Sequence, residues 1–523
     1  MRKFLLLMNT LRYLRAKQVW YRLYYSIRRK FKNNKIELKS FENPSCFLLN
    51  FQEFLKGNEK YKNGEFKFLN LSKKFNEVDW NFSGFGKLWV YNLNYFDFLN
   101  QKSIKLEEAL SLIKHFISKI EQIEIGLEPY PTSLRTINWI KFLSANRVKN
   151  KEICIFLYAQ YKMLLKNLEY HLMGNHLLEN GFSLLFGAYF FRNEFFYNKA
   201  KEILLEELEE QVLSDGGHFE QSPMYHQIIL ERLLDAINLI KNNSWKGQEL
   251  LEILCEKAEK MLGWLREITF ANGNIPLFND SAFGIAFSTE QLLDYAMKLG
   301  LKPADVRLGD SGYRMIRKGK YEIAIDIGDI KAKYIPGHSH ADTFTFELYI
   351  NNTPIVVDTG VSTYENNKKR ILERSTKAHN TVEVNEESSS EVWGSFRVGG
   401  RAKVVEVEER KDYVRAIHDG YFKKFGVFHQ REYFFKENEI VIKDKILGGK
   451  RVNAVARLHF HPKVEIESKE KFILMNNFCK IEIEGGKFKI VKYEYAPEFN
   501  KLIPGKCVEI FFQDKLECKI GIC

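Results

Sequence analysis

The stretch Leu106-Glu-Glu-Ala-Leu-Ser-Leu-Ile-Lys-His-Phe-Ile117 places apolar residues three and four positions apart, which is the spacing of one face of an α-helix. The same spacing recurs downstream, and only short polar breaks separate the repeats. Breaks of this length are typical of antiparallel helical hairpins. The expected helices cover residues 133–146, 151–170, 176–192, 196–213, 223–242 and 246–266.

Beyond Asp310 the pattern changes from helical to strand-like. Runs of β-branched and aromatic residues alternate with Gly, Asn and Lys-Glu turns, which is typical of antiparallel strands. A block of helices followed by a block of strands predicts a multidomain α+β protein and not a βαβ sheet. The expected strands include 321–327, 343–350, 402–407, 413–418 and 439–446. The expected domains are an N-terminal basic arm and lead-in (1–104), a helical domain (105–305) and a strand domain (306–523).

Length and composition are consistent with this division. The chain has 523 residues, 45% of them hydrophobic, which is enough for two or more cores. No internal stretch approaches the roughly 18 unbroken apolar residues of a membrane span. The seven cysteines are scattered and form no CxxC motif, so neither a disulfide framework nor a cysteine-based metal site is expected.

The charge balance favours a polyanionic partner. The chain has 79 Lys and Arg against 67 Asp and Glu, a formal net charge of +12, and basic clefts concentrate anions. No zinc finger, RNP pattern or basic-region heptad is present, so an acidic polysaccharide is favoured over nucleic acid.

Much of the basic excess lies near the N-terminus, between Arg12 and Lys35, where Lys and Arg are interspersed with tyrosines. The chain starts with a positive segment, but the following apolar run is shorter than a cleavable signal requires. A basic amphipathic arm on a membrane surface is the alternative that these residues leave open. A cytoplasmic location also stays open.

Two histidines one residue apart introduce the strand half, in Pro336-Gly-His338-Ser-His340-Ala-Asp342. In a strand they would share one face. Asp358 ends the strand-like run after them and His379 opens the next one. Two imidazoles and a carboxylate from neighbouring strands can form a three-ligand zinc-type site, with the other histidine facing a substrate. Hydrogen-bonded core histidines are the simpler alternative.

A second polar cluster lies in the helical half. Asn175, His176 and Glu179 fall on adjacent parts of one expected helix face, although a helix N-cap with a solvated turn would explain the first two. Further on, a glycine-containing loop leads into a helix at Pro223, a favoured first-turn residue. Tyr225 is therefore expected in a first helical turn beside a loop.

These residues carry a family resemblance that covers most of the chain: it resembles the heparinase II/III-like polysaccharide lyases. Together the matching strings are highly specific, and they imply an incomplete (α/α) toroid followed by an antiparallel β-sandwich. The strings are Gly86–Phe96, Arg135-Thr-Ile-Asn-Trp139, Asn175-His-Leu-Leu-Glu-Asn180, Asp215–Tyr225, Phe278-Asn-Asp280, Pro336–Asp342, Asp358-Thr-Gly-Val-Ser-Thr-Tyr364, Glu373–Asn380 and Glu391-Val-Trp393.

The resemblance implies β-elimination at a uronic acid. In this chemistry the adjacent carboxylate is neutralised, the C5 proton is removed and the bond to O4 breaks. Asn175 and His176 match the neutralising positions, and Glu179 matches a position that orients or protonates neighbouring groups. Tyr225 matches the general acid–base phenol and His338 the opposing base.

The resemblance also implies a structural divalent metal held by His340, Asp358 and His379, with zinc favoured by the imidazole ligands. Three residues are also expected to form sugar subsites. An equally favoured interpretation is that they belong to the core, where the tryptophan packs beside a fully hydrogen-bonded arginine. The residues concerned are Arg135, Asn138 and Trp139.

The strings do not select among heparan sulfate, heparin and alginate. The string Trp89-Val-Tyr-Asn-Leu-Asn-Tyr95 resembles relatives associated with bacterial surface-polysaccharide production, which implies a cell-envelope or periplasmic location. Two other functions stay open. One is a non-catalytic protein that binds acidic glycans or takes part in surface-polysaccharide assembly. The other is a hydrolase that recruits Asp215 and Glu220 as paired carboxylic acids.

Overall fold

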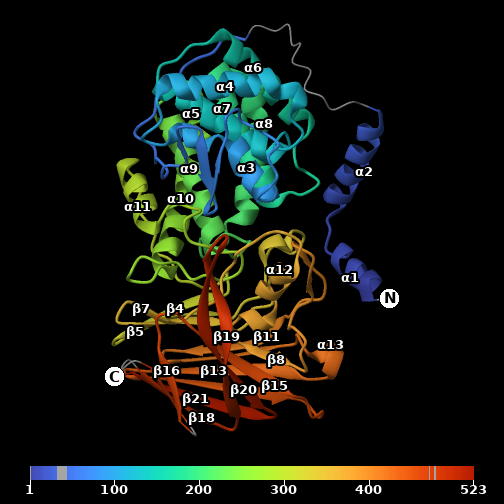
Figure 1. Cartoon of the computed structure of the whole chain (residues 1–523), viewed down its shortest axis with the longest axis vertical. Helices are drawn as coiled ribbons and strands as arrows, with labels where there is room; N and C mark the ends of the chain where they lie inside the picture. The colour runs from blue at the N-terminus through green and yellow to red at the C-terminus, as the bar shows by residue number, and fades with distance from the viewer. Residues whose placement is uncertain (1, 32–43, 470–471, 476–478, 523) are drawn as a thin grey trace.

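The computed structural model describes residues 2–31, 44–469, 472–475 and 479–522. It shows a helical part followed along the chain by a β part, and the two lie against each other (Figure 1). This arrangement confirms the expected fold class, an (α/α) toroid followed by an antiparallel β-sandwich. The helices are α1 (Arg2–Leu11), α2 (Ala16–Phe31), α3 (Lys87–Tyr95), α4 (Leu106–Lys119), α5 (Pro129–Ala145), α6 (Lys151–Lys166), α7 (Gly174–Phe191), α8 (Glu194–Gln211), α9 (Pro223–Lys241), α10 (Gln248–Ile268), α11 (Thr289–Lys298), α12 (Lys368–Glu373) and α13 (Phe422–Phe425), with short 3₁₀ helices at Asp97–Asn100, Ile120–Gln122, Pro336–His338 and Thr376–Ala378.

Local sequence signals set where several of these helices begin. Asn150, Asn193 and Ser222 each accept a backbone N–H bond at the start of α6, α8 and α9. Pro129 and Pro223 occupy first-turn positions, where the missing N–H costs nothing. The six helices expected between 133 and 266 are confirmed, each within a few residues of its predicted ends.

The β part consists of two large sheets whose strand pairs are antiparallel. One sheet has the order β11-β12-β13-β14-β21-β18-β17-β16, and the other has the order β19-β20-β15-β7-β6-β5-β4, with β8 paired to β15. Their strands are β4 (Tyr313–Lys318), β5 (Tyr321–Asp326), β6 (Phe346–Ile350), β7 (Thr353–Val356), β8 (Val382–Val384), β11 (Val404–Arg410), β12 (Tyr413–His418), β13 (Phe428–Lys436), β14 (Glu439–Leu447), β15 (Ala454–Phe460), β16 (Ile466–Lys469), β17 (Phe472–Met475), β18 (Cys479–Glu484), β19 (Lys487–Glu498), β20 (Lys501–Phe512) and β21 (Lys515–Ile522).

Each part has its own hydrophobic core. In the β part, Ile323 and Phe346 from one sheet share a buried cluster with Ile442 and Ile481 from the other, as expected of a sandwich. The helical core includes Leu49 and residues up to 99, so much of the expected lead-in segment packs within the helical part. The domain boundaries at 104/105 and 305/306 stay predictions.

Three features were not expected from the sequence. A small sheet, β1 (Tyr61–Lys62), β2 (Glu65–Phe68) and β3 (Leu71–Lys74), precedes α3, and a second small sheet pairs β9 (Val392–Trp393) with β10 (Arg397–Val398). Cys46 and Cys154 form a disulfide, although no disulfide framework was expected; a separation of 108 residues carries no spacing signal. None of the helices described here is long and apolar enough to cross a membrane.

The histidine pair does not lie on a strand. Pro336–His338 forms a 3₁₀ turn, and His340 follows it in a loop before β6. The expectation that the two histidines share one face of a strand is therefore wrong. Pro336 favours a turn, since it fixes its own φ and lacks the N–H that a central strand would use.

Candidate active site

Tyr225 and His338 meet where the helical and β parts face each other. Tyr225 lies in the first turn of α9, whose N-cap residue Ser222 accepts the Tyr225 backbone N–H at 3.2 Å. The Tyr225 and His338 rings are stacked, with centroids 3.8 Å apart and planes inclined by 29°. Although they are 113 positions apart in sequence (338 − 225), the phenol and the imidazole form one unit.

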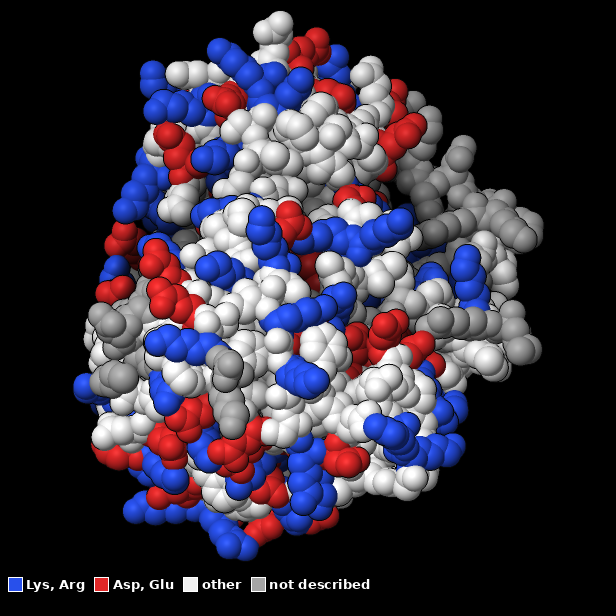
Figure 2. All heavy atoms as spheres, turned by 60° about the horizontal axis from the view of Figure 1, so that its bottom comes forward, with Lys and Arg blue, Asp and Glu red and all other residues white. Residues whose placement is uncertain are grey.

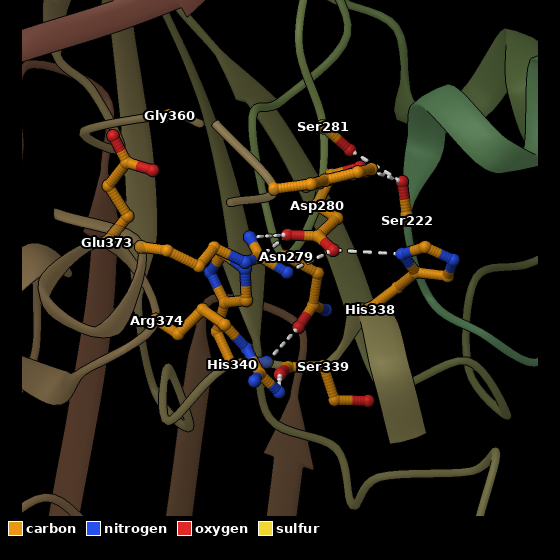
Figure 3. Close-up of polar contacts among 12 residues, drawn as sticks. Ser222, Asn279, Asp280, Ser281, His338, Ser339, His340, Gly360, Glu373 and Arg374 are labelled. Atoms are coloured by element: carbon orange, nitrogen blue, oxygen red, sulfur yellow. Dashed lines mark hydrogen bonds and ion pairs between the residues drawn. The ribbon is translucent and has the colours of Figure 1, made fainter. Parts of the chain in front are cut away.

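Asp280 fixes the orientation of His338. The carboxylate lies between His338 and His340, as Figure 3 shows: its Oδ2 is 2.9 Å from His338 Nδ1 and its Oδ1 is 2.8 Å from His340 Nε2. Arg370 donates both Nη groups to the same carboxylate. Ser222 Oγ donates to the Asp280 carbonyl at 2.7 Å, which ties the first turn of α9 to this loop.

The charge on Asp280 decides the tautomer of His338. Burial acts to raise the pKa of the Asp280 carboxyl, but Arg370 and the two imidazole bonds outweigh it and hold that pKa well below its usual range. An ionised carboxylate only accepts hydrogen bonds, so His338 Nδ1 must donate. His338 Nε2 is then the basic nitrogen, and it lies 3.8 Å from Glu220 Oε2.

Asn175 and His176 begin α7 on the helical side of the same site. Asn175 Nδ2 donates to Glu220 Oε2 at 3.0 Å, while its buried Oδ1 has no hydrogen-bond partner. His176 Nδ1 lies 3.0 Å from Glu169 Oε1. Burial acts to lower the pKa of the His176 imidazole, but the Glu169 carboxylate outweighs it and raises that pKa. Of the two donors, His176 is therefore the one that can carry a positive charge, whereas the Asn175 amide is neutral.

One cavity of about 1440 Å³ connects these groups. Four of the five expected catalytic residues line it, together with a second phenol, Tyr364, whose Oη donates to Tyr225 Oη at 3.4 Å. Burial is the main cause that raises the pKa of Tyr225 well above its ordinary value, with Tyr364 adding to it. The Tyr225 phenol is therefore protonated at neutral pH. The four expected residues are Asn175, His176, Tyr225 and His338.

Glu179 does not line this cavity. Its side chain is buried, and its Oε1 accepts from Arg232 Nε at 2.7 Å. Burial raises the pKa of this carboxyl. The structure therefore places Glu179 behind the site, where it contacts α9.

The expected sugar subsites are wrong, because all three side chains are interior. Arg135 is fully buried and donates to the Gly126 carbonyl and to Gln160. Asn138 donates to a backbone carbonyl of α3, and Trp139 packs among phenylalanines of neighbouring segments. The alternative, a core tryptophan beside a satisfied arginine, describes what the structure shows.

The expected metal ligands are not assembled as one three-ligand site. His340 bonds to Asp280, and His379 Nδ1 instead lies 2.7 Å from Asp358 Oδ2. No group of three or more His, Cys, Asp or Glu within the described ranges is arranged to hold a metal ion. The two imidazoles are nevertheless close, with centroids 5.2 Å apart, and each keeps a buried ring nitrogen without a partner, His340 Nδ1 and His379 Nε2.

Several site residues make contacts that were not expected from the sequence. Asp280 was noticed only within a matching string, although it contacts both histidines and Arg370. Glu169 and Glu220 orient His176 and Asn175, and neither contact follows from sequence spacing. The nearest signal was the density of polar residues around Glu220, which lies in the loop before α9.

Comparison with known proteins identifies the family of this chain. The family model described as "Heparinase II/III N-terminus" matches residues 87–298, and "Heparinase II/III-like, C-terminal" matches residues 301–519. The chain belongs to the heparinase II/III-like family. As a family member it resembles a heparin-sulfate lyase of Bacteroides stercoris, with 26% identity over 376 residues, which is 65% of this chain and 53% of that protein. The chain thus spans about half the length of this curated relative.

Solved structures share the fold of this family member at low sequence identity. The crystal structure of heparinase III has a TM-score of 0.69 and 16% identity, over 93% of this chain and 88% of that one. Heparan sulfate lyase HepC from Pedobacter heparinus has a TM-score of 0.54 and 15% identity, over 88% of this chain and 81% of that one.

Proposed function

We propose that this chain is a polysaccharide lyase, a carbon–oxygen lyase that cleaves an anionic, uronic-acid-containing polysaccharide by β-elimination. The observation that carries the proposal is the Tyr225–His338 stack, with the Nδ1 of His338 held by Asp280, in one cavity with Asn175 and His176. The named activities of the curated relatives also support it.

In the proposed reaction, His338 Nε2 accepts the C5 proton. The C5–H electron pair forms the C4=C5 double bond as the C4–O4 bond breaks, and Tyr225 donates its phenolic proton to O4. Asn175 and His176 face the substrate carboxylate and stabilise the negative charge that develops there. Such stabilisation of the transition state is on the order of 3–4 kcal/mol per preorganised donor. The protonated phenol of Tyr225 and the orientation of His338 Nδ1 toward Asp280 are those that this step requires.

A hydrolase on the same scaffold is disfavoured by the position of Asp215. Its Oδ2 accepts from the backbone N–H groups of Gly309 and Ser311 at 3.0 and 2.9 Å, and the residue does not line the cavity. A carboxylate satisfied in this way holds a loop in place and is not positioned as one of two catalytic acids.

The test is to incubate the purified protein with heparan sulfate, alginate, hyaluronan and surface polysaccharide from the organism that encodes it. Elimination produces an unsaturated uronate that absorbs in the ultraviolet, whereas hydrolysis produces only new reducing ends. We expect ultraviolet absorbance to rise with at least one of these polymers. Tight binding without cleavage would instead favour the glycan-binding or assembly alternative.

We also propose that His340 and His379 hold a structural divalent ion, with zinc favoured by imidazole ligands. The support is their proximity and their two partnerless ring nitrogens. The bond from His379 Nδ1 to Asp358 is of the kind that orients a metal-binding imidazole from outside the coordination sphere. Such an ion would supply rigidity beneath His338, and the proposed elimination uses protein side chains alone.

We further propose peripheral membrane contact through the N-terminal arm, residues 2–31, and a location at the cell envelope. The arm contains nine Lys and Arg and no Asp or Glu. Its outer face exposes Phe4, Trp20, Leu23 and Ile27, each more than half exposed. Basic residues beside exposed apolar ones favour an anionic membrane surface. Co-sedimentation with anionic but not zwitterionic vesicles is expected, and equal recovery with both would contradict it.

A further inference from the structure

The N-terminal arm bridges the helical and β parts, although it precedes the residues that either family model matches. On the helical side, Tyr25 Oη donates to the Leu168 carbonyl at 2.5 Å, and Gln18 Nε2 donates to the Leu172 carbonyl at 2.9 Å. On the β side, Trp393 Nε1 donates to Thr10 Oγ1 at 3.1 Å. Figure 1 shows α2 beside the helical part and α1 beside the β part.

The inner face of this arm forms one wall of the cavity that holds Tyr225 and His338. The arm is therefore part of the site and not a separate appendage. Its lining residues are Leu7, Thr10, Leu11, Leu14, Arg22 and Tyr25.

The charges around the cavity are mixed, and this restricts where an anion would bind. Lys87 lies 3.3 Å from Glu128, so this cation is already paired. Two further lining carboxylates, Glu121 and Glu124, lie on the same helical side of the cavity. A polyanion would be repelled there. On the surface shown in Figure 2, Lys and Arg are likewise interspersed with Asp and Glu.

Two other cations that line the cavity, Arg22 of α2 and Arg397 of β10, differ from Lys87. Neither guanidinium has an ion-pair partner among the residues that the structure describes: Arg22 donates Nε to the His171 carbonyl at 3.2 Å, and Arg397 lies over the Trp393 ring at 4.6 Å. Both side chains line the same cavity, and the arm contacts β10 beside Arg397, where Thr10 Oγ1 donates to the Val398 carbonyl at 3.4 Å. Partial burial lowers the pKa of Arg22, and repulsion from Arg397 adds to this lowering.

We propose that Arg22 and Arg397 form a subsite for an anionic group of the glycan, a carboxylate or a sulfate, and that the N-terminal arm completes this subsite. An anion between the guanidinium groups would relieve their repulsion, and each group can bind such an anion through two parallel N–H bonds. The subsite is close to the reaction centre, because Phe396, the residue before Arg397, has its ring centroid 6.1 Å from that of His338. The inference rests on the proposed function and specifies the charge that the substrate must carry.

The test uses binding in an inactive background, so that it does not depend on cleavage. Arg22→Gln and Arg397→Gln are each combined with Tyr225→Phe, and binding to alginate and to heparan sulfate is measured at low and high salt. Lys3→Gln is the matched control, because Lys3 is an exposed α1 cation outside the cavity. Each arginine variant is expected to weaken binding on the order of tenfold and to reduce its salt dependence, while the control binds normally.

The two polymers distinguish the sources of the anion. If the arginine variants bind both polymers more weakly, the anion in the subsite is a carboxylate. If they bind only heparan sulfate more weakly, the anion is a sulfate. Arginine variants that bind as tightly as the Tyr225→Phe parent, or a parent that binds neither polymer, would overturn the subsite. The wild-type protein could also bind a polymer through both arginines and cleave none. That result would support the subsite and contradict the proposed lyase activity.

Discussion

The phenol of Tyr225 lies flat against the imidazole of His338, and the two rings come from different halves of the molecule. The stack forms only if α9 and the 3₁₀ turn at Pro336–His338 are held together. The Ser222 bond to the Asp280 carbonyl and the Asp280 bond to His338 do this. The reaction centre therefore depends on the contact between the two parts, and Asp280 is the residue that joins them.

Asp280→Asn should lower turnover by about 10²–10⁴-fold, since an amide can donate to His338 Nδ1 and stabilise the tautomer with the wrong basic nitrogen. It should also destabilise the fold by about 3–5 kcal/mol, because Arg370 would be left as a buried charge without its partner. Turnover and its pH profile are measured below the melting temperature of the variant. A folded variant with parental turnover and pH profile would show that Asp280 has only a structural role.

Glu169→Gln should move the alkaline limb of the pH–activity profile to lower pH. The Glu169 carboxylate raises the pKa of His176, so removing its charge lets that pKa fall, and the protonated form that neutralises the substrate is lost sooner as pH rises. Glu124→Gln is the matched control, a lining carboxylate for which no bond to His176 is found. Superimposable profiles for the parent and Glu169→Gln would show that His176 does not act as a cation.

Asp444 provides a test of stability away from the site. Burial acts to raise its pKa, but Arg431 and His429 outweigh it and lower the pKa to about 2. A lowered folded-state pKa means that the stabilisation is complete above the unfolded value of about 3.9 and is lost as pH falls toward about 2, in total about 2–3 kcal/mol. Asp444→Asn should be less stable than the parent at pH 7, and the difference in unfolding free energy should shrink in acid. A difference that is constant with pH would contradict this.

The proposed metal predicts about one equivalent of a divalent ion in the purified protein. Replacement of His340 or His379 by Ala should release it and lower the melting temperature, because each removes a ligand. His461→Gln, a histidine outside this cluster, is the control. Elemental analysis that finds no metal in the parent would reduce the pair to hydrogen-bonded core histidines.

The helices were predictable from sequence because apolar spacing and first-turn residues act locally. Pro223 both predicted the start of α9 and occupies it. Arg135 and Trp139 show the limit of this reasoning: a charged residue and an aromatic residue in a matching string could equally face substrate or the core, and only packing decides that they are interior.

The site was only partly predictable for the same reason. Asn175, His176, Tyr225 and His338 could be assigned through the family resemblance, and the structure brings them to one cavity. The contacts that orient them join residues far apart in sequence, 90 positions in the case of Arg370 and Asp280, and no local spacing encodes such a pairing. The N-terminal arm was expected to be a surface element, and its inner face proved to line the cavity.

The most direct test of the central claim compares the parent with Tyr225→Phe on a polysaccharide that the parent cleaves, by ultraviolet absorbance of the unsaturated product. The substitution keeps the ring on His338 and removes the proton that O4 requires. We expect turnover to fall by about 10²–10⁴-fold while glycan binding and the melting temperature stay near the parental values. Full activity of Tyr225→Phe would contradict the account, because it would show that the phenol takes no part in the elimination.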